Sequence, residues 1–167
     1  MEKKLKVLSY KTCTPSELPE TDKSLVELAK EASEKSYAPY SNFKVGCAVL
    51  LEDRSIYAGS NQENASSPCG TCAERTTLYY ANAEHPESAI KRMVIVAQRD
   101  GKFTDYPVSP CGLCRQAMLG SENRYNRRIH LTLYGEKECL IFGTTKSLLP
   151  FQFDAQDLLS NDEDSEE

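Results

Sequence analysis

Three cysteines and one glutamate are the residues of this chain whose types and spacing are best suited to chemistry. Cys111 and Cys114 stand three positions apart, and Cys72 is followed two positions later by Glu74. Side chains three apart at the start of a helix project to one face, so two thiolates can bind one metal ion. With Cys72 as third ligand, a tetrahedral zinc ion keeps its fourth position for water, as a catalytic zinc site requires. Glu74 can then face that water as a general acid or base without binding the metal.

A closed structural zinc site is the main alternative. Cys69 stands three positions before Cys72, so the chain has two Cys-x-x-Cys pairs, which together match a four-cysteine site that excludes water. Zinc ribbons usually place their two halves ~15–20 residues apart. Here Cys111 follows Cys72 by 39 positions. The spacing therefore favours the open site with three cysteines, and the pairing argues against a set of unrelated buried thiols.

The size and composition of the chain indicate one globular domain. It has 167 residues, of which 40% are hydrophobic and 27% are charged, and a chain of this size buries about two thirds of its unfolded surface. No apolar run is long enough to cross a membrane, and the N-terminus lacks the apolar stretch of a secretory signal. We therefore expect a cytoplasmic protein in which the seven cysteines are metal ligands or free thiols.

The negative charge of the chain is concentrated at its C-terminus. Residues 161–167 hold five acidic side chains, which equals the net charge of −5. We expect residues 159–167 to form an acidic, disordered tail, while the folded part is close to neutral. Because binding to long nucleic acids draws on clustered lysine and arginine, this balance argues against a polynucleotide partner and favours a small uncharged ligand.

The hydrophobic pattern predicts an α/β domain that positions these residues. Helices are predicted from residue 21 or 22 to 36, and over 72–84, 111–119 and 145–149; strands are predicted over 5–10, 43–52, 55–60, 93–97, 129–134 and 138–142. A hairpin followed by α/β crossovers predicts a mixed sheet of roughly five strands with helices on both faces, a three-layer α/β/α sandwich. Cys72 and Cys111 would then lie at two helix N-termini, whose dipoles favour negative charge.

Five sequence blocks, taken in order, resemble the homotetrameric cytidine deaminases of pyrimidine salvage. They are YAPYSNFKVG (37–46), NQENA (61–65), CAERT (72–76), PCGLCRQ (110–116) and LLP (148–150). We take residues 22–158, which the resemblance covers, as the catalytic domain and residues 1–21 as an N-terminal extension. The resemblance implies a cytidine deaminase-like fold and one zinc ion per subunit. It also implies the hydrolysis of cytidine or deoxycytidine to the uracil nucleoside and ammonia.

The resemblance implies roles for individual residues of the metal centre. It makes Cys72, Cys111 and Cys114 the zinc ligands, and Glu74 the residue that moves protons between water, ring N3 and the leaving amine. Arg75 is similar to the family arginine that hydrogen-bonds the ligand sulfurs. A solvent-facing helix arginine is the structural alternative.

Substrate contacts follow from the same resemblance. Asn61 and Glu63 resemble the pair that binds the ribose hydroxyls, although a turn at a strand end explains Asn61 equally well. Phe43, Ala73 and Phe153 match positions that contact the base, and either phenylalanine taken alone is more often a core residue. Phe153 would reach the site of a neighbouring subunit, so the active unit would be a homotetramer with composite sites.

Two positions depart from the family pattern, and other activities stay open. Gln62 stands where valine or isoleucine is usual, and Ser67 where many members have a tyrosine near a subunit boundary. Deaminases of modified cytosine nucleosides, such as the antibiotic blasticidin, share the zinc blocks, but Asn61 and Glu63 favour a plain ribose. A zinc-binding interaction module without catalysis is the alternative from a different class.

Overall fold

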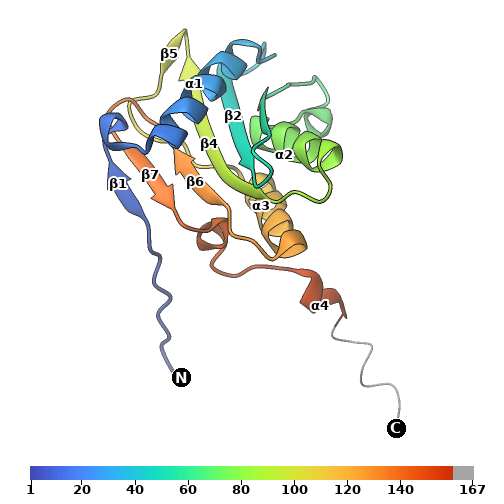
Figure 1. Cartoon of the computed structure of the whole chain (residues 1–167). Helices are drawn as coiled ribbons and strands as arrows, with labels where there is room; N and C mark the ends of the chain where they lie inside the picture. The colour runs from blue at the N-terminus through green and yellow to red at the C-terminus, as the bar shows by residue number, and fades with distance from the viewer. Residues whose placement is uncertain (160–167) are drawn as a thin grey trace.

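A computed structural model describes residues 1–159 and shows one β-sheet with helices on both faces (Figure 1). The strands are β1 (Lys11–Cys13), β2 (Phe43–Leu51), β3 (Ile56–Ser60), β4 (Ile90–Arg99), β5 (Lys102–Phe103), β6 (His130–Leu133) and β7 (Cys139–Phe142). The helices are α1 (Glu20–Glu34), α2 (Ala73–Glu84), α3 (Gly112–Tyr125) and α4 (Ala155–Leu159), and short 3-10 turns occupy Pro15–Glu17, Ser67–Cys69 and Thr145–Leu148. Within residues 1–159, no helix has the length and apolar character needed to cross a membrane.

The sheet is mixed, as the sequence predicts, but it has seven strands instead of about five. Its order is β1-β7-β6-β4-β2-β3, and β5 pairs with the end of β4. The β4 and β6 strands run parallel, while every other neighbouring pair in the described chain is antiparallel. The additional strands β1 and β5 are only three and two residues long, too short for a period-2 pattern to reveal them.

The side chains of the central strands alternate between two cores, which confirms the three-layer arrangement. Cys47 and Val49 of β2 pack with residues of α2 and α3 on one face. Ala48, between them, packs with residues of α1 on the other face. The α1 backbone approaches β2 so closely that a Cβ at Gly46 would lie 1.8 Å from the carbonyl oxygen of Ala29. The α2 and α3 helices therefore share one side of the sheet, where the predicted site residues gather.

Several predicted boundaries were wrong. Residues 5–10 are not a strand: pairing with β7 begins only at Lys11, and Leu5 and Val7 are 85% and 90% exposed. The α3 helix continues beyond residue 119 to Tyr125, the segment near 145–149 is a 3-10 turn, and α4 was not expected. Of the predicted acidic tail, residues 160–167 lie outside the described residues.

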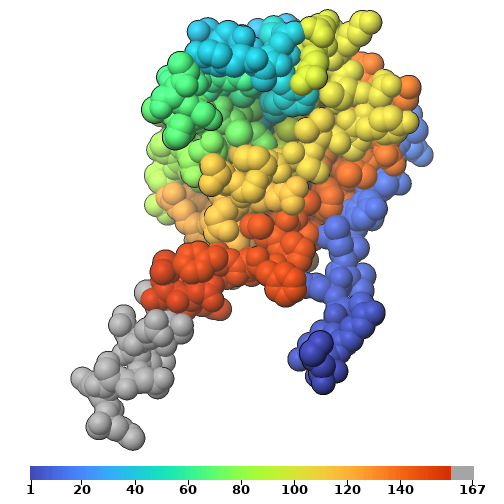
Figure 2. Space-filling view, turned by 180° about the vertical axis from the view of Figure 1, so that it is seen from behind, coloured from blue at the N-terminus to red at the C-terminus, as the bar shows by residue number. Residues whose placement is uncertain are grey.

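Both ends of the described chain leave the body at the same end of the molecule. The N-terminal residues before β1 and the segment that leads into α4 extend from the body in both views (Figures 1 and 2). The predicted metal ligands lie elsewhere, at the N-termini of α2 and α3.

Candidate functional site

The structure brings the three predicted ligand cysteines together at two helix N-termini. Cys72 immediately precedes α2, Cys111 immediately precedes α3, and Cys114 lies in the first turn of α3. The sulfurs of Cys72 and Cys111 are 3.8 Å apart, those of Cys111 and Cys114 are 3.5 Å apart, and all three lie within 4.8 Å of one another. Two sulfurs that each bind a tetrahedral zinc ion at about 2.3 Å are separated by about 3.8 Å. The cluster therefore has the spacing that a zinc ion requires.

A fourth cysteine does not join this cluster. Cys69 ends the 3-10 turn Ser67–Cys69, its side chain is exposed, and it is absent from the metal-binding group of the described chain. The closed four-cysteine alternative is therefore not formed. The arrangement leaves room for a water molecule as the fourth ligand, which distinguishes catalytic from structural zinc sites.

The sulfurs of the cluster are electrostatically coupled to each other and to Arg75. A hydrogen bond from the Cys114 thiol lowers the pKa of Cys72 to about 5, and the same bond, together with burial, raises the pKa of Cys114. Burial alone would lower the pKa of Arg75, but the sulfurs of Cys72 and Cys114 outweigh it and raise that pKa. Arg75 is half-buried, and its Nε is buried without a hydrogen-bond partner among the described residues. Its role toward the ligand sulfurs stays a prediction of the resemblance.

Glu74 is a buried carboxyl beside the cysteine cluster. It is the second residue of α2 and only 5% exposed. Burial raises the pKa of Glu74, its own backbone N–H opposes that shift, and the negative charge of Cys72 adds to it. A raised pKa makes the carboxylate a stronger base, which favours its use as a general acid/base.

A cavity of about 240 Å³ connects Glu74 with most of the predicted substrate contacts. Phe43, Asn61, Glu63, Cys72 and Cys111 all line it, and the side chains of Val45, Ile95, Ala97 and Val108 supply apolar walls. A wider cleft of about 510 Å³ adjoins it and shares Asn61, Glu63, Cys72 and Cys111 as lining residues. The cavity therefore has an apolar interior with a few polar groups, the usual composition of a small-molecule site.

Asn61 is held by the backbone of β2. Its Oδ1 accepts the Val45 N–H at 2.8 Å, and its Nδ2 donates to the Phe43 carbonyl at 2.9 Å. The amide thus continues the β2–β3 pairing for one more residue, which is the structural role that the strand-end alternative describes. One N–H of the amide still remains for another acceptor.

Glu63 fixes a turn at the edge of the cavity. Its carboxylate accepts the Tyr40 N–H at 2.8 Å, the Ser41 N–H at 3.3 Å and the Ser41 hydroxyl. The hydrogen bond from the Ser41 side chain and the backbone of Tyr40 and Ser41 lower the pKa of Glu63. The Glu63 carboxylate is therefore ionised and contributes a negative charge to the wall of the cavity.

The three residues predicted to contact the base differ in their positions. Phe43 lines the cavity, and the Arg99 guanidinium lies 5.4 Å from its ring centroid. Ala73 is fully buried in the core on the α2 side of the sheet. Phe153 is 57% exposed and lines a different cavity beside α3, where its carbonyl accepts a hydrogen bond from Gln116 at 2.8 Å. The structure of one chain does not bring Phe153 to its own Glu74.

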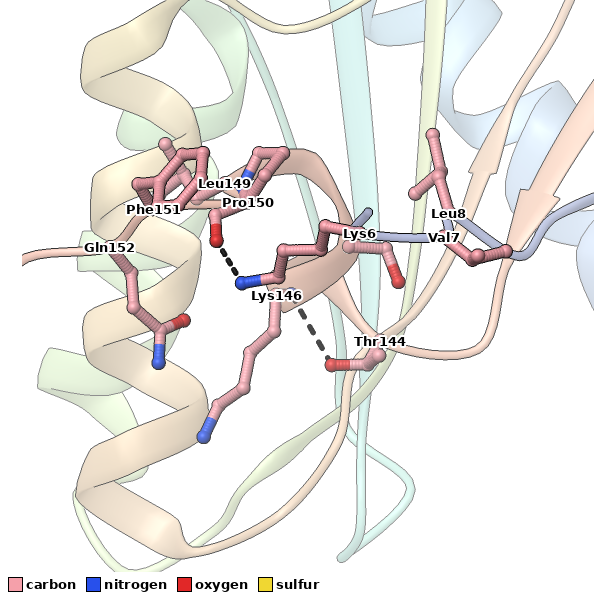
Figure 3. Close-up of a pocket in the computed structure, with 10 residues that line it drawn as sticks. Lys6, Val7, Leu8, Thr144, Lys146, Leu149, Pro150, Phe151 and Gln152 are labelled. Carbon is pink, nitrogen blue, oxygen red and sulfur yellow. Dashed lines mark hydrogen bonds between the residues drawn. The ribbon is translucent and has the colours of Figure 1, made fainter. Parts of the chain in front are cut away.

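Several lining residues were missed from the sequence. Ile95 and Ala97 have the pattern of buried strand residues, so nothing in the sequence separates them from plain core. Val108 and Ser109 precede the Cys111 motif, and their closeness to Pro110 was a signal that could have identified them. A cavity of about 580 Å³ between Lys6–Leu8 and residues 144–152 contains none of the predicted site residues (Figure 3).

Comparisons with known proteins agree with this geometry. Residues 19–127 match the family model for the cytidine and deoxycytidylate deaminase zinc-binding region. The chain is 40% identical over 135 residues to the cytidine deaminase of Sporosarcina psychrophila, covering 80% of this chain and 92% of that protein. The cytidine deaminase of Halalkalibacterium halodurans is 38% identical over 135 residues, or 80% of this chain and 95% of that protein.

A solved structure gives the same result for the fold. The crystal structure of cytidine deaminase from Burkholderia pseudomallei matches with a TM-score of 0.67 and 36% identity. The match covers 78% of this chain and 98% of the Burkholderia chain. The match to the family model includes all three cysteines of the cluster. The chain also covers nearly the whole length of these relatives. The chain belongs to the zinc-binding cytidine and deoxycytidylate deaminase family.

Proposed function

We propose that this chain is a zinc-dependent hydrolase that removes the 4-amino group of cytidine, deoxycytidine or both. The products are uridine or deoxyuridine and ammonia. The observation that carries the proposal is the juxtaposition of an open cluster of three cysteines with the buried carboxyl of Glu74 at one small cavity. A structural zinc site does not require such a carboxyl, because its zinc ion has four protein ligands and binds no water molecule that could be deprotonated.

Cys72, Cys111 and Cys114 would hold the zinc ion. When bound, zinc supplies Lewis-acid activation of a water molecule for attack on C4 of the ring. Glu74 accepts a proton from that water, delivers it to N3, and later helps to protonate the departing amine. The raised pKa of Glu74 favours this exchange, since the carboxyl must take up and release a proton in one turnover. Arg75 orients the sulfurs and offsets part of the negative charge of three thiolates.

The cavity walls would bind the rest of the nucleoside. Phe43 and the apolar residues of β2 and β4 contact the base and exclude bulk water. Asn61 and Glu63 lie between the inner cavity and the wider cleft, where a sugar attached to the base would extend. The amide of Asn61 has a free donor, and the carboxylate of Glu63 can accept further hydrogen bonds, so both can bind ribose hydroxyls. These hydrogen-bonding groups favour a nucleoside with an unmodified ribose over a heavily modified nucleoside.

We also propose the domain boundaries, the oligomeric state and the cellular compartment of the enzyme. Residues 22–158 would form the catalytic domain, with residues 1–21 as an extension. Phe153 would complete the site of a neighbouring subunit in a homotetramer, because it lies away from the cavity of its own chain. All seven cysteines are free thiols, which fits a reducing cytoplasm and a role in pyrimidine salvage.

A spectrophotometric assay tests the activity. Zinc-replete protein is mixed with cytidine or deoxycytidine, and the loss of cytosine absorbance is followed together with ammonia release. We expect both signals with at least one substrate, and their loss after the metal is removed with a chelator. A zinc-replete, folded protein that leaves both nucleosides unchanged would overturn the proposal.

A further inference from the structure

Arg115 bridges two segments that are far apart in the sequence. It directly follows the ligand Cys114 on α3. Its Nε donates to the Pro110 carbonyl at 2.9 Å, and its Nη1 donates to the Leu148 carbonyl at 3.2 Å. Pro110 is the residue before the ligand Cys111. One guanidinium therefore ties the turn that enters the metal centre to the end of the 3-10 turn Thr145–Leu148.

The same helix holds the other end of that 3-10 turn. Glu122 stands seven residues after Arg115 and so lies on the same face of α3. Its buried carboxylate accepts the Thr145 N–H at 2.7 Å, the Thr144 hydroxyl at 2.7 Å and the Ile129 N–H at 2.8 Å. The turn is thus fixed to α3 at its beginning by Glu122 and at its end by Arg115.

The chain that follows the turn is held as well. Gln116 donates to the Phe153 carbonyl at 2.8 Å. On another side, the Lys6 ammonium donates to the Pro150 carbonyl and lies 5.3 Å from the ring centroid of Phe151 (Figure 3). The Leu148 carbonyl is therefore an acceptor on a restrained segment and not on a free loop, so it can serve as a support for the Arg115 side chain.

Cys111 is the ligand that most needs such support. Cys114 is buried within α3, whereas Cys111 is exposed, precedes the helix and follows a stretch without regular structure, residues 107–110. Pro110 has no N–H, so its carbonyl is the only backbone group through which a hydrogen bond can hold it. Arginine suits this task because its planar guanidinium presents two donors in a fixed geometry, which the single ammonium of lysine does not.

We propose that Arg115 is a positioning residue for the metal centre. It holds the Pro110 carbonyl against the supported 3-10 turn and thereby keeps the Cys111 sulfur in its place beside Cys72 and Cys114. Its effect on turnover rests on the proposed deaminase function, but its effect on metal retention does not. The residue acts through the backbone of a ligand and contacts neither substrate nor metal.

The test compares two arginines of α3. Arg115→Lys keeps the positive charge and most of the aliphatic side chain but loses the planar guanidinium with its two fixed donors. The matched control is Arg124→Lys: Arg124 also donates to a proline carbonyl, that of Pro86 at 3.1 Å, but far from the cysteines. Zinc transfer from the zinc-loaded protein to a chromogenic chelator is measured well below the unfolding temperature, with circular dichroism confirming the fold.

We expect Arg115→Lys to lose zinc about tenfold faster than the parent or more, the lower end for residues that orient metal ligands. Arg124→Lys should stay within about twofold of the parent. Amide hydrogen exchange at residues 145–149 should also increase in Arg115→Lys, because the support loses a donor. Arg115→Gln, which keeps one donor on a shorter stem, gives a second variant if Arg115→Lys does not fold.

Faster exchange at residues 145–149 without faster zinc loss would overturn the proposal, because Arg115 would then stabilise only the fold. Unchanged zinc loss and unchanged exchange would overturn it too. Zinc loss is measured without substrate, so an absence of activity on cytidine in the parent would count against the deaminase function alone.

Discussion

The two halves of the site are built in different ways. The proposed metal half consists of Cys72, Cys111, Cys114 and Glu74. These residues lie at the N-termini of two helices on the same side of the sheet, and one chain brings them together. The substrate half uses extended segments and turns around Phe43, Asn61 and Glu63. Its last predicted member, Phe153, lies outside the cavity of its own chain.

This difference follows from the local structure of each half. Helix N-termini fix the direction of their first side chains and favour negative charge, so three thiolates can be preorganised by two helices. Segments around the cavity are held by single side chains such as Asn61, whose amide replaces a strand pair. Changes of the three ligand cysteines should therefore remove metal and turnover together. Changes in the substrate half should alter turnover while the metal stays bound.

The largest effect is expected from the ligand cysteines. Cys72→Ala, Cys111→Ala or Cys114→Ala should each lose most of the zinc, since a site with three protein ligands cannot spare one. Turnover of cytidine should fall by roughly 10³-fold or more, because Lewis-acid activation contributes several kcal/mol. Metal analysis and the absorbance assay measure the two losses.

Cys69→Ala is the control for those variants, because Cys69 is an exposed cysteine three residues from a ligand. It should keep both zinc and activity. A protein that needs Cys69 for zinc binding, and that keeps its function without Glu74, would instead be a closed four-cysteine module.

Glu74→Gln should separate metal binding from chemistry within the metal half. Glutamine keeps the shape of the side chain but cannot carry the proton, so turnover should fall by at least ~10²-fold while zinc and fold are retained. Glu84→Gln, at the exposed end of the same helix, should have no effect on either. Near-normal turnover in zinc-replete Glu74→Gln would contradict the proposed mechanism.

The sequence predicted the metal half better than the substrate half for a physical reason. Spacing along a helix places Cys111 and Cys114 on one face, so a short pattern is enough to identify two ligands. The two hydrogen bonds of Asn61 and the bridge formed by Arg115 have backbone N–H and carbonyl groups as partners, and such partners leave no mark in the sequence. The Leu148 carbonyl lies 33 residues from Arg115, and only the folded chain brings them together.

The fold shows the same distinction between local and long-range information. The long amphipathic helix α1 and the alternating strand β2 were predicted within a few residues, because each carries its own periodicity. Leu5–Tyr10 has the composition of a strand but finds no partner, since β7 offers only residues 139–141 to β1. Strand formation depends on the neighbouring strand as well as on propensity.

Phe153→Ala tests the part of the substrate half that one chain does not complete. If Phe153 stacks on the base in a neighbouring site, its loss should cost about 1–3 kcal/mol, or roughly ten- to a hundredfold in turnover. Zinc content should not change. Phe151→Ala is the matched control, since Phe151 is 91% exposed and only two residues away; it should stay close to the parent.

Mixed oligomers sharpen the same test. Glu74→Gln and Phe153→Ala proteins, unfolded and refolded together, should form some sites that combine an intact Glu74 with an intact Phe153 from the adjacent subunit. Activity should then exceed the sum of the two separate proteins. If mass analysis shows mixed oligomers and the activity is only additive, Phe153 serves its own subunit or only the core.

The smallest effect is expected from the turn that Glu63 holds. Hydrogen bonds from Ser41 and Tyr40 lower the pKa of Glu63, so the ionised carboxylate stabilises the folded state. That contribution is present above the ordinary carboxyl pKa of about 4.3 and is lost as the pH falls through the lowered folded-state pKa. Because Glu63 is only half-buried at the edge of the cavity, solvent screening keeps the effect small. Urea midpoints of the parent and Glu63→Gln should differ slightly at about pH 7 and converge as the pH falls below the lowered folded-state pKa of Glu63.

Activity adds a second measurement to the same variant. Glu63→Gln should raise KM for cytidine by about tenfold, the worth of one charge-assisted hydrogen bond to a sugar hydroxyl, and leave the zinc content unchanged. Asp53→Asn is its control: Asp53 likewise accepts a backbone N–H, that of Ser55 at 2.8 Å, and its pKa is also lowered, but it lies outside the cavity. It should share the convergence of the urea midpoints at low pH and leave KM unchanged. Equal changes of KM in both variants would mean that the effect does not come from a contact between Glu63 and the substrate.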